Sequence, residues 1–244
     1  MRKLLLSLLI TLWGTILLSQ DLGISFSAGI ASYQLEELRL FQQELLTRLP
    51  KEAKQFSDFP SYTNLEFSLL KKTSSSLVLG LVYAYSATGS HANYRDYSGN
   101  LNLDQRIGAY QFGLLASYPL LNKELKKSQL ELAVNGNLRL AYLRNNVLSE
   151  INTAYYYESN EVLMTGISPT LLFGIQGMWQ KGNISLGLEG GYLLDAGSEL
   201  KFGDIANYQP SVSLLSNDAI QSDLSGLRAN VKIIFWIEPT KPQE

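Results

Sequence analysis

The sequence predicts an all-β fold: an antiparallel transmembrane β-barrel of about eight strands, with one amphipathic helix in the first long loop. Three observations lead to this prediction. Between residues 60 and 237, apolar side chains alternate with small or polar ones in repeated stretches of about ten residues or more. Short and long connections alternate along the chain, as in small membrane barrels. The N-terminus has the pattern of a secretory signal peptide.

The clearest expected strand is the segment 130–142. Successive side chains of a strand point to opposite faces, and one face of this segment carries Leu130, Leu132, Val134, Gly136, Leu138, Leu140 and Tyr142. The other face carries Glu131, Ala133, Asn135, Asn137, Arg139 and Ala141. A secreted soluble β-sandwich, the rival fold, would share this alternation, but its strands are usually only about five or six residues long. The length of the segment favours a tilted membrane span.

Similar segments complete the expected set of strands. They cover residues 22–33, about 62–71, 76–86, 103–118, 130–142, about 162–179, 183 to about 195, and about 224–237. Pro169 has no N–H to donate to a neighbouring strand, so we expect a bulge or an early strand end there.

The connections and the aromatic residues fix the expected orientation. Short links are expected at 72–75, 119–128 and 181–182, and long ones at 34–61, 87–102, 144–161 and 197–223. Small barrels have short turns on the periplasmic side, so an even strand number places both ends of the barrel there. Interfacial aromatic residues fall at both strand ends, Tyr118, Trp179 and Phe235 beside the short turns and Tyr85, Tyr142 and Tyr192 beside the long loops.

The chain divides into a signal peptide at 1–19, a barrel domain at 20–238 and a C-terminal tail at 239–244. Residues 34–49 form the expected loop helix, because Leu35, Leu38, Phe41, Leu45 and Leu49 recur at helical spacing and Pro50 would stop the helix. Its apolar stripe must find cover. It could pack over the barrel mouth or its own loop, or it could lie in the outer leaflet or bind a partner.

Composition excludes several function classes. The formal net charge of −2 argues against general attraction to nucleic acid. The absence of Cys excludes disulfides, thiolate metal sites and a Cys nucleophile. With a single His and scattered carboxylates, such as His91 and Asp96, the ligand density of a metal site is not reached, so we expect no metal and no cofactor.

The inward faces of the expected strands collect charges: Glu66, Glu131, Arg139, Glu189, Arg228 and Lys232. A barrel of about eight strands has an interior just wide enough for side chains to fill. We therefore expect these charges to pair with one another as a structural network. The alternative is a narrow ion path or a proton-linked site.

Two stretches resemble a known family. The run from Tyr85 to Gly99, followed by Asp104-Gln105, resembles the "S-T-G-S/G-R-x-x-Y-x-D-Y-S-G-E" motif of a family of uncharacterised bacterial outer-membrane β-barrel proteins. Leu35 to Leu38, Leu49-Pro50, Lys54 and Asp58 to Asn64 are similar to the same family's helix and "D-F-P-x-Y-x-N" segment. The resemblance implies a small outer-membrane barrel and brings no biochemical activity. This chain departs from the family at His91, where Arg is usual, and at Asn100, where Glu is usual.

We expect no enzymatic activity. The alternative is an outer-membrane enzyme of lipid A acyl chemistry, which Ser90-His91 would suggest. Adjacent residues of an extended segment point to opposite sides, so Ser90 is not the hydroxyl that His91 would activate. Ser86 or Ser98, with Asp96 as the orienting carboxylate, would be needed instead.

The expected role is structural or surface recognition through the long loops, in the cell outer membrane. The loop candidates are Tyr94, Arg95, Asp96, Tyr97, Tyr155, Tyr156 and Tyr157. Tyr155 to Tyr157 could stack on surface glycans or anchor a protein ligand, or could instead contact lipid headgroups. The aromatic finish of the segment 227–237 suggests recognition by the barrel assembly machinery, and we expect a monomer surrounded by outer-membrane lipid.

Overall fold

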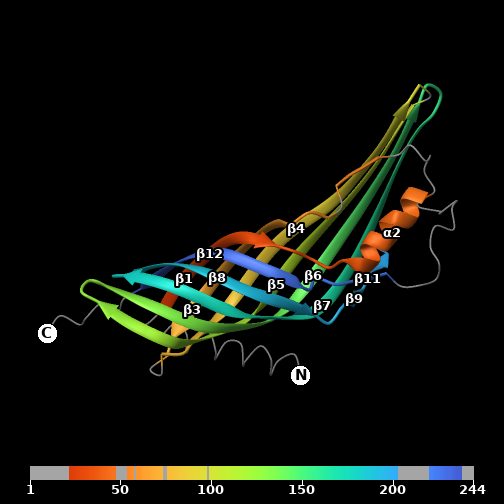
Figure 1. Cartoon of the computed structure of the whole chain (residues 1–244). Helices are drawn as coiled ribbons and strands as arrows, with labels where there is room; N and C mark the ends of the chain where they lie inside the picture. Colours follow the sequence, from red (N-terminus) through yellow and green to blue (C-terminus); the bar gives the residue numbers. More distant parts are fainter. Residues whose placement is uncertain are drawn as a thin grey trace.

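The computed structural model describes residues 22–47, 54–57, 59–73, 76–97, 99–202 and 220–237. Its main sheet closes into an antiparallel ring of eight strands (Figure 1). The ring contains, in spatial order, β1 (Leu22–Ala31), β3 (Tyr62–Lys72), β4 (Val78–Asp96), β5 (Gly99–Leu125), β6 (Ser128–Thr153), β7 (Tyr157–Lys181), β8 (Ile184–Asp195) and β12 (Gly226–Ile237). β1 pairs with β12 from Leu22 and Ile237 to Ala31 and Arg228, which closes the ring.

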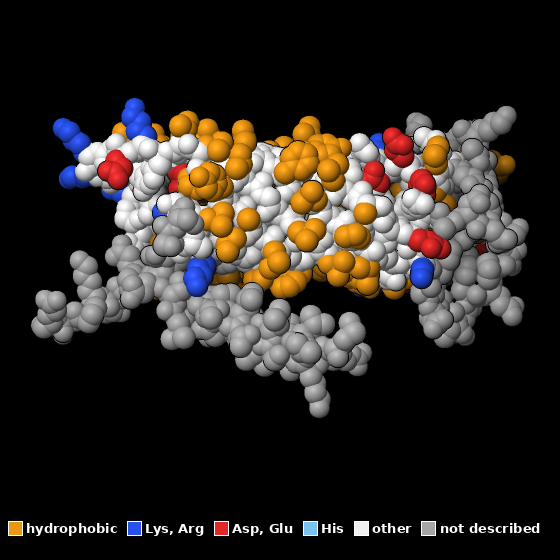
Figure 2. Space-filling model, turned by 90° about the horizontal axis from the view of Figure 1, so that it is seen from below, with side chains coloured by type: hydrophobic (Ala, Val, Ile, Leu, Met, Phe, Trp, Pro, Cys, Tyr) orange, Lys and Arg blue, Asp and Glu red, His pale blue; other side chains and the backbone are white. Residues whose placement is uncertain are grey.

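The predicted transmembrane barrel is therefore confirmed, and the rival soluble sandwich is wrong. A single closed ring has no second sheet to cover its outer face, and that face is apolar over its middle. Figure 2 shows the apolar side chains gathered there, with charged side chains toward the two ends. No helix among the described residues is long and apolar enough to cross a membrane. The expected signal peptide at 1–19 and tail at 239–244 lie outside the described residues.

The face assignment along β6 is as predicted. Leu130, Leu138 and Tyr142 are exposed on the outside, while Arg139 and Ala141 are buried inside. The predicted girdle residues also face outward. On the long-loop side, the rings of Tyr85, Tyr110 and Tyr142 follow one another across three strands, with centroids 5.0 and 6.4 Å apart.

Two of the expected long loops, 87–102 and 144–161, are wrong, because strands fill most of both. β4 continues to Asp96, and β5, β6 and β7 are 27, 26 and 25 residues long. A membrane span needs only about 9–11 residues. The four strands therefore rise beyond the tyrosine girdle as one paired sheet, which we call the extension (residues 87–109 and 143–166; Figure 1).

The physical reason for this error is an inversion of the apolar face. Within the membrane belt of β5 the apolar residues at even positions, such as Phe112 and Leu114, face outward. In the extension the apolar residues at odd positions, such as Leu103 and Ile107, face inward and are buried. Lipid favours apolar residues outside and water favours them inside. The same strand thus changes its pattern where it leaves the membrane.

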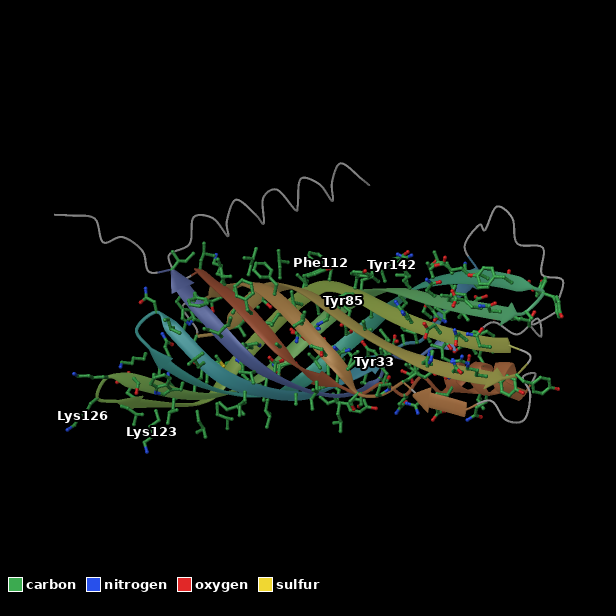
Figure 3. All side chains as sticks on the ribbon, turned by 90° about the horizontal axis from the view of Figure 1, so that it is seen from above. Tyr33, Tyr85, Phe112, Lys123, Lys126 and Tyr142 are labelled. Carbon is green, nitrogen blue, oxygen red and sulfur yellow. The ribbon has the colours of Figure 1, made fainter. Side chains whose placement is uncertain are left out.

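The expected short link at 119–128 is also shorter than predicted. β5 runs on to Leu125 and β6 begins at Ser128, with a register shift between Pro119 and Leu121. A bulge accommodates the proline in the ladder. This hairpin carries Lys123 and Lys126 at the end of the barrel away from α2 (Figure 3).

Pro169 does not produce the expected bulge or strand end. β7 runs through it, and Pro169 pairs with Leu140 without a register shift. Its carbonyl accepts a hydrogen bond from the Ala196 N–H at 3.2 Å, so its nitrogen faces the β8 side. The β7–β8 ladder ends beside it, at Thr170 and Asp195. The missing N–H therefore falls where the ladder needs no further donor.

The loop helix, α2 (Glu36–Thr47), begins two residues later than the predicted 34–49, and residues 48–49 lie outside the described residues. It packs over the barrel mouth, the first of the two expected alternatives, with Leu35 and Leu38 fully buried. Leu49 and the side chain of Leu45 lie outside the described residues. The expected loop 197–223 contributes β9 (Ser198–Glu199), β10 (Lys201–Phe202) and β11 (Gln221–Ser222). β9 pairs with β11 beside α2 (Figure 1). We call α2, β9 and β11 together the cap.

The interior consists of three layers. Under the cap lies an upper apolar layer that includes Tyr33, Leu38, Ile107, Leu143 and Leu224. At the short-turn end lies a lower apolar layer of Leu70, Val82, Leu115, Met178 and Ile234, with Val78 and Trp236 packed against it. Between them the buried inward side chains are mostly polar. The polar layer is thus enclosed by apolar packing at both ends.

Candidate functional site

The polar layer is organised around Glu66 on β3 and Arg139 on β6. The Arg139 Nη1 and Nη2 atoms donate to Glu66 Oε1 and Oε2 at 3.0 and 3.1 Å, a two-pronged ion pair across the lumen. Nη1 also lies 3.3 Å from Oε1 of Gln111, and Asn64 Nδ2 donates to Glu66 Oε1 at 3.0 Å. The pairing expected from the sequence is present for these two charges.

Space for the Arg139 side chain comes from Gly113 on the neighbouring strand. Gly113 pairs with Arg139, and a Cβ added to it would lie 2.9 Å from the Arg139 Cγ and closer still to backbone atoms. Only glycine fits at so close an approach.

A second pair joins Glu189 on β8 and Lys232 on β12. Their side chains form a buried ion pair, and Lys232 Nζ lies 3.3 Å from Gln176 Oε1. Gln176 Nε2 in turn donates to Ser117 Oγ at 2.9 Å. The half-buried Glu131 lines a small, partly open cavity of about 30 Å³ below this pair, together with Lys232.

Arg228 is the buried lumen cation without a carboxylate partner among the described residues. Its Nη1 donates to Asn64 Oδ1 at 2.9 Å, and its guanidinium carbon lies 5.7 Å from the centroid of the Tyr33 ring. Tyr33 stacks on Tyr62 with centroids 4.0 Å apart. The expected single charge network is therefore two separate ion pairs and one arginine held by an amide and an aromatic ring.

The loop candidates lie mainly at the far end of the extension. Tyr97 is 103% exposed and Tyr155 is 100% exposed, and Tyr156 and Tyr157 are also exposed. Gly99 pairs with Thr153, so the β4–β5 and β6–β7 turns lie side by side. We call the four exposed tyrosines, Tyr97, Tyr155, Tyr156 and Tyr157, the tyrosine tip. Arg95 is exposed and Tyr94 is half-buried, while the Asp96 side chain lies outside the described part.

One tip tyrosine is held in place. Tyr156 donates a hydrogen bond to the Glu158 carboxylate, which lowers the pKa of that carboxyl and raises the pKa of the phenol. The Tyr156 carbonyl accepts from the Thr153 N–H at 2.8 Å, which closes the turn. Tyr156 therefore lies on a turn closed by a backbone hydrogen bond.

His91 lies on the outer face of the extension and contacts Asp104, with Nδ1 to Oδ1 at 2.6 Å. The carboxylate beside His91 is thus Asp104 of the neighbouring strand. Ser86 and Ser90 are both buried on the opposite face, where they bond to Tyr33 and Gln42. Ser98 lies outside the described residues, and β2 (Lys54–Ser57) places the backbone of Ser57 opposite His91. The described residues contain no group of three or more ligands suited to a metal ion.

These features define the class: a small transmembrane β-barrel with a filled interior and a long extension beyond one membrane face. Among solved structures, the chain is similar to the crystal structure of Neisserial surface protein A (NspA), at 11% identity over 89% of this chain and 97% of that chain, with a TM-score of 0.38. It is also similar to LpxR from Salmonella typhimurium, at 9% identity over 88% of this chain and 99% of that chain, with a TM-score of 0.22. No protein-family model and no curated protein matches the chain. The family resemblance noted from the sequence therefore stays a prediction.

Proposed function

We propose that this chain is an outer-membrane protein that binds a partner outside the cell through the tyrosine tip, and that it neither conducts ions nor catalyses a reaction. The observation that carries the proposal is the pair of adjacent, exposed aromatic turns at the end of the extension. Long strands with a packed inner face hold these turns well away from the membrane belt.

The composition of the tip supports binding. Tyrosine supplies a large contact area at a low entropic cost and is enriched where proteins recognise partners. At Tyr97 and Tyr155 this area is fully exposed. The distance of the tip from the girdle argues against the alternative of lipid headgroup contact, because headgroups lie directly beyond the girdle.

The lumen supports a role that does not require transport. Two apolar layers lie above and below the ion pairs, and the partly open cavity of about 30 Å³ has room for little more than a water molecule.

Replacing Tyr155, Tyr156 and Tyr157 together by Ala tests the proposal. We expect binding of the purified barrel to an array of surface glycans, or to cell-surface protein extracts, to fall about tenfold or more, because buried aromatic anchors supply most of the energy of such contacts. The matched control is Tyr118→Ala, which removes an exposed tyrosine at the opposite end. Binding that survives the triple replacement, or that Tyr118→Ala abolishes equally, would contradict the proposal.

The lipid-modifying alternative has one observation in its favour, the His91–Asp104 pair, since an orienting carboxylate on histidine is part of many general-base pairs. Ser86 and Ser90 point away from it. We expect His91→Ala to leave the number of acyl chains on lipid A unchanged in cells that express the protein, measured by mass spectrometry. A shift in acyl number that depends on His91 would replace the present proposal by an enzymatic one.

A further inference from the structure

A row of basic side chains crosses the outer wall directly beyond the tyrosine girdle. Arg144 on β6 pairs with Gly108 on β5 and with Thr165 on β7, and Thr165 pairs with Lys201 on β10. Arg106 lies on the same face of β5 as Gly108, two residues further out, and all three cations are exposed. We call Arg106, Arg144 and Lys201 the basic row. Arg106 and Arg144 are diagonal neighbours, whose Cα atoms lie about 7–8 Å apart in a sheet.

Beside the basic row, the outer surface of the barrel carries only small side chains, which leave a shallow hollow. Gly108 pairs with Ala87, so two small residues face each other on the outer surface. A Cβ added to Gly108 would meet only the rings of Tyr85 and Tyr110, each at 3.9 Å. The floor of this hollow is therefore small residues, with tyrosine rings on its membrane side and arginines on its outer side.

A groove leads from the hollow into the membrane belt. The β3–β4 pairing ends at Asn64 and Ser86, whereas β4 continues, and a depression of about 340 Å³ fills the opening between Pro60, Thr63, Ala87 and Gly89. A second depression of about 530 Å³ continues over the apolar belt of β12, β1 and β3, floored by Ala28. The two depressions adjoin each other, because Leu65 and Tyr85 line both, and we call them together the groove.

The chemistry of the groove changes along its length in the way a membrane lipid does. Its lower part is lined mainly by apolar side chains that already face the acyl chains of the bilayer. Its upper part ends at Gly89, which pairs with Arg106 of the basic row at the height expected for headgroups, where Arg recognises phosphate through paired donors. Arg106 Nη2 forms an ion pair with Asp104 Oδ2 at 3.5 Å, on the side away from the membrane, and 79% of the Arg106 side chain stays exposed.

We propose that the groove and the basic row bind one phosphate-bearing lipid of the surrounding leaflet, with an acyl chain along Leu65 and Tyr85 and the phosphate at Arg106 and Arg144. Charge complementarity and the continuity of the groove with the lipid-facing belt both identify a lipid as the occupant. This lipid site rests on the proposed membrane placement but does not depend on recognition through the tyrosine tip. It gives the outer wall a second binding function.

Native mass spectrometry of the detergent-folded barrel tests the lipid site. The probes are dimyristoyl phosphatidic acid, dimyristoylglycerol with the same chains and no phosphate, and inorganic phosphate. We expect one tightly retained phosphatidic acid, weak retention of dimyristoylglycerol, and no competition by inorganic phosphate. Replacing both Arg106 and Arg144 by Gln should weaken phosphatidic acid binding about 30-fold, since each basic residue near an anionic surface contributes about fivefold.

Filling the groove supplies a second test. Ala87→Phe should reduce retention of phosphatidic acid and dimyristoylglycerol alike, because it blocks the acyl chain. The matched controls are Ala116→Phe, at an outward alanine elsewhere on the belt, and Lys123→Gln, at the opposite end. Heat-dependent gel mobility verifies that each variant is folded. Equal retention of the two lipids by the native chain, or equal losses in the control variants, would overturn the proposal. Glycan binding that survives in the tip variants would contradict the proposed recognition function and leave the lipid site intact.

Discussion

Single residues decide the stability of the barrel interior. Arg139 and Glu66 are 2% and 6% exposed and share two hydrogen bonds, so each neutralises a charge that would otherwise be buried without a partner. Removing one member of a buried pair is far more costly than removing both, because the remaining charge keeps its desolvation penalty.

Arg139→Met should therefore lower the free energy of unfolding by about 3–5 kcal/mol. The double variant Glu66→Leu with Arg139→Met should lose less than the single variant, since no isolated charge remains. Urea unfolding of the barrel folded in lipid vesicles, followed by Trp fluorescence, measures both. Arg95→Met, at an exposed position, is the control. A single variant as stable as the native chain would mean that the pair is not formed.

The inward position of all six lumen charges could be predicted, because side-chain direction follows a period of two. Their partners could not. Which carboxylate meets Arg139 depends on how β3, β5 and β6 are placed around the ring, and no local pattern encodes that placement. The same holds for Asn64 and Gln111, whose amides complete the first pair. Arg228 departs furthest from the expectation, because its aromatic partner Tyr33 follows β1 at the other end of the chain.

At the scale of elements, strand identity could be predicted and strand length could not. Each expected strand overlaps one strand of the ring, but several of the expected ends differ from the observed ones. The ends were misjudged in the extension, because Asn93, Asn102 and Asn146 face water there and give those stretches the composition of loops. The signal that could have corrected this is the shift of apolar residues from even to odd positions in β5 and β6, which keeps the period and changes the face.

The tyrosine tip and the basic row differ in how far the sequence alone reveals them. Tyr155 to Tyr157 are adjacent in sequence and could be proposed as one group. Arg106, Arg144 and Lys201 are brought together only by the pairing of β5, β6, β7 and β10. Residues that become neighbours through register alone carry no signal in a single sequence.

For the whole molecule, the layered interior predicts a closed barrel. In planar bilayers we expect no large, stable single-channel openings, because an ion would have to cross two apolar layers as well as the ion pairs. Deleting α2 should not open a channel, since the lower layer of Leu70, Val82, Leu115, Met178 and Ile234 would remain. Regular openings of the native chain would show that the interior is hydrated and that the lumen charges line a path.

The position of the cap has a consequence for the wall itself. The first and last strands meet at one seam. The segments that lead from these strands into the cap continue the pairing, with backbone hydrogen bonds from Ser32 N to Leu227 O at 2.9 Å, Gln34 N to Ser225 O at 3.0 Å and Leu35 N to Asp223 O at 3.2 Å. α2 follows β1 directly, and Glu37 accepts a hydrogen bond from the N–H of Gln221 in β11. Parting β1 from β12 would therefore require the cap to come off first. We therefore expect that the seam does not act as a lateral gate for lipids, and that these hydrogen bonds form only after the last strand has been inserted.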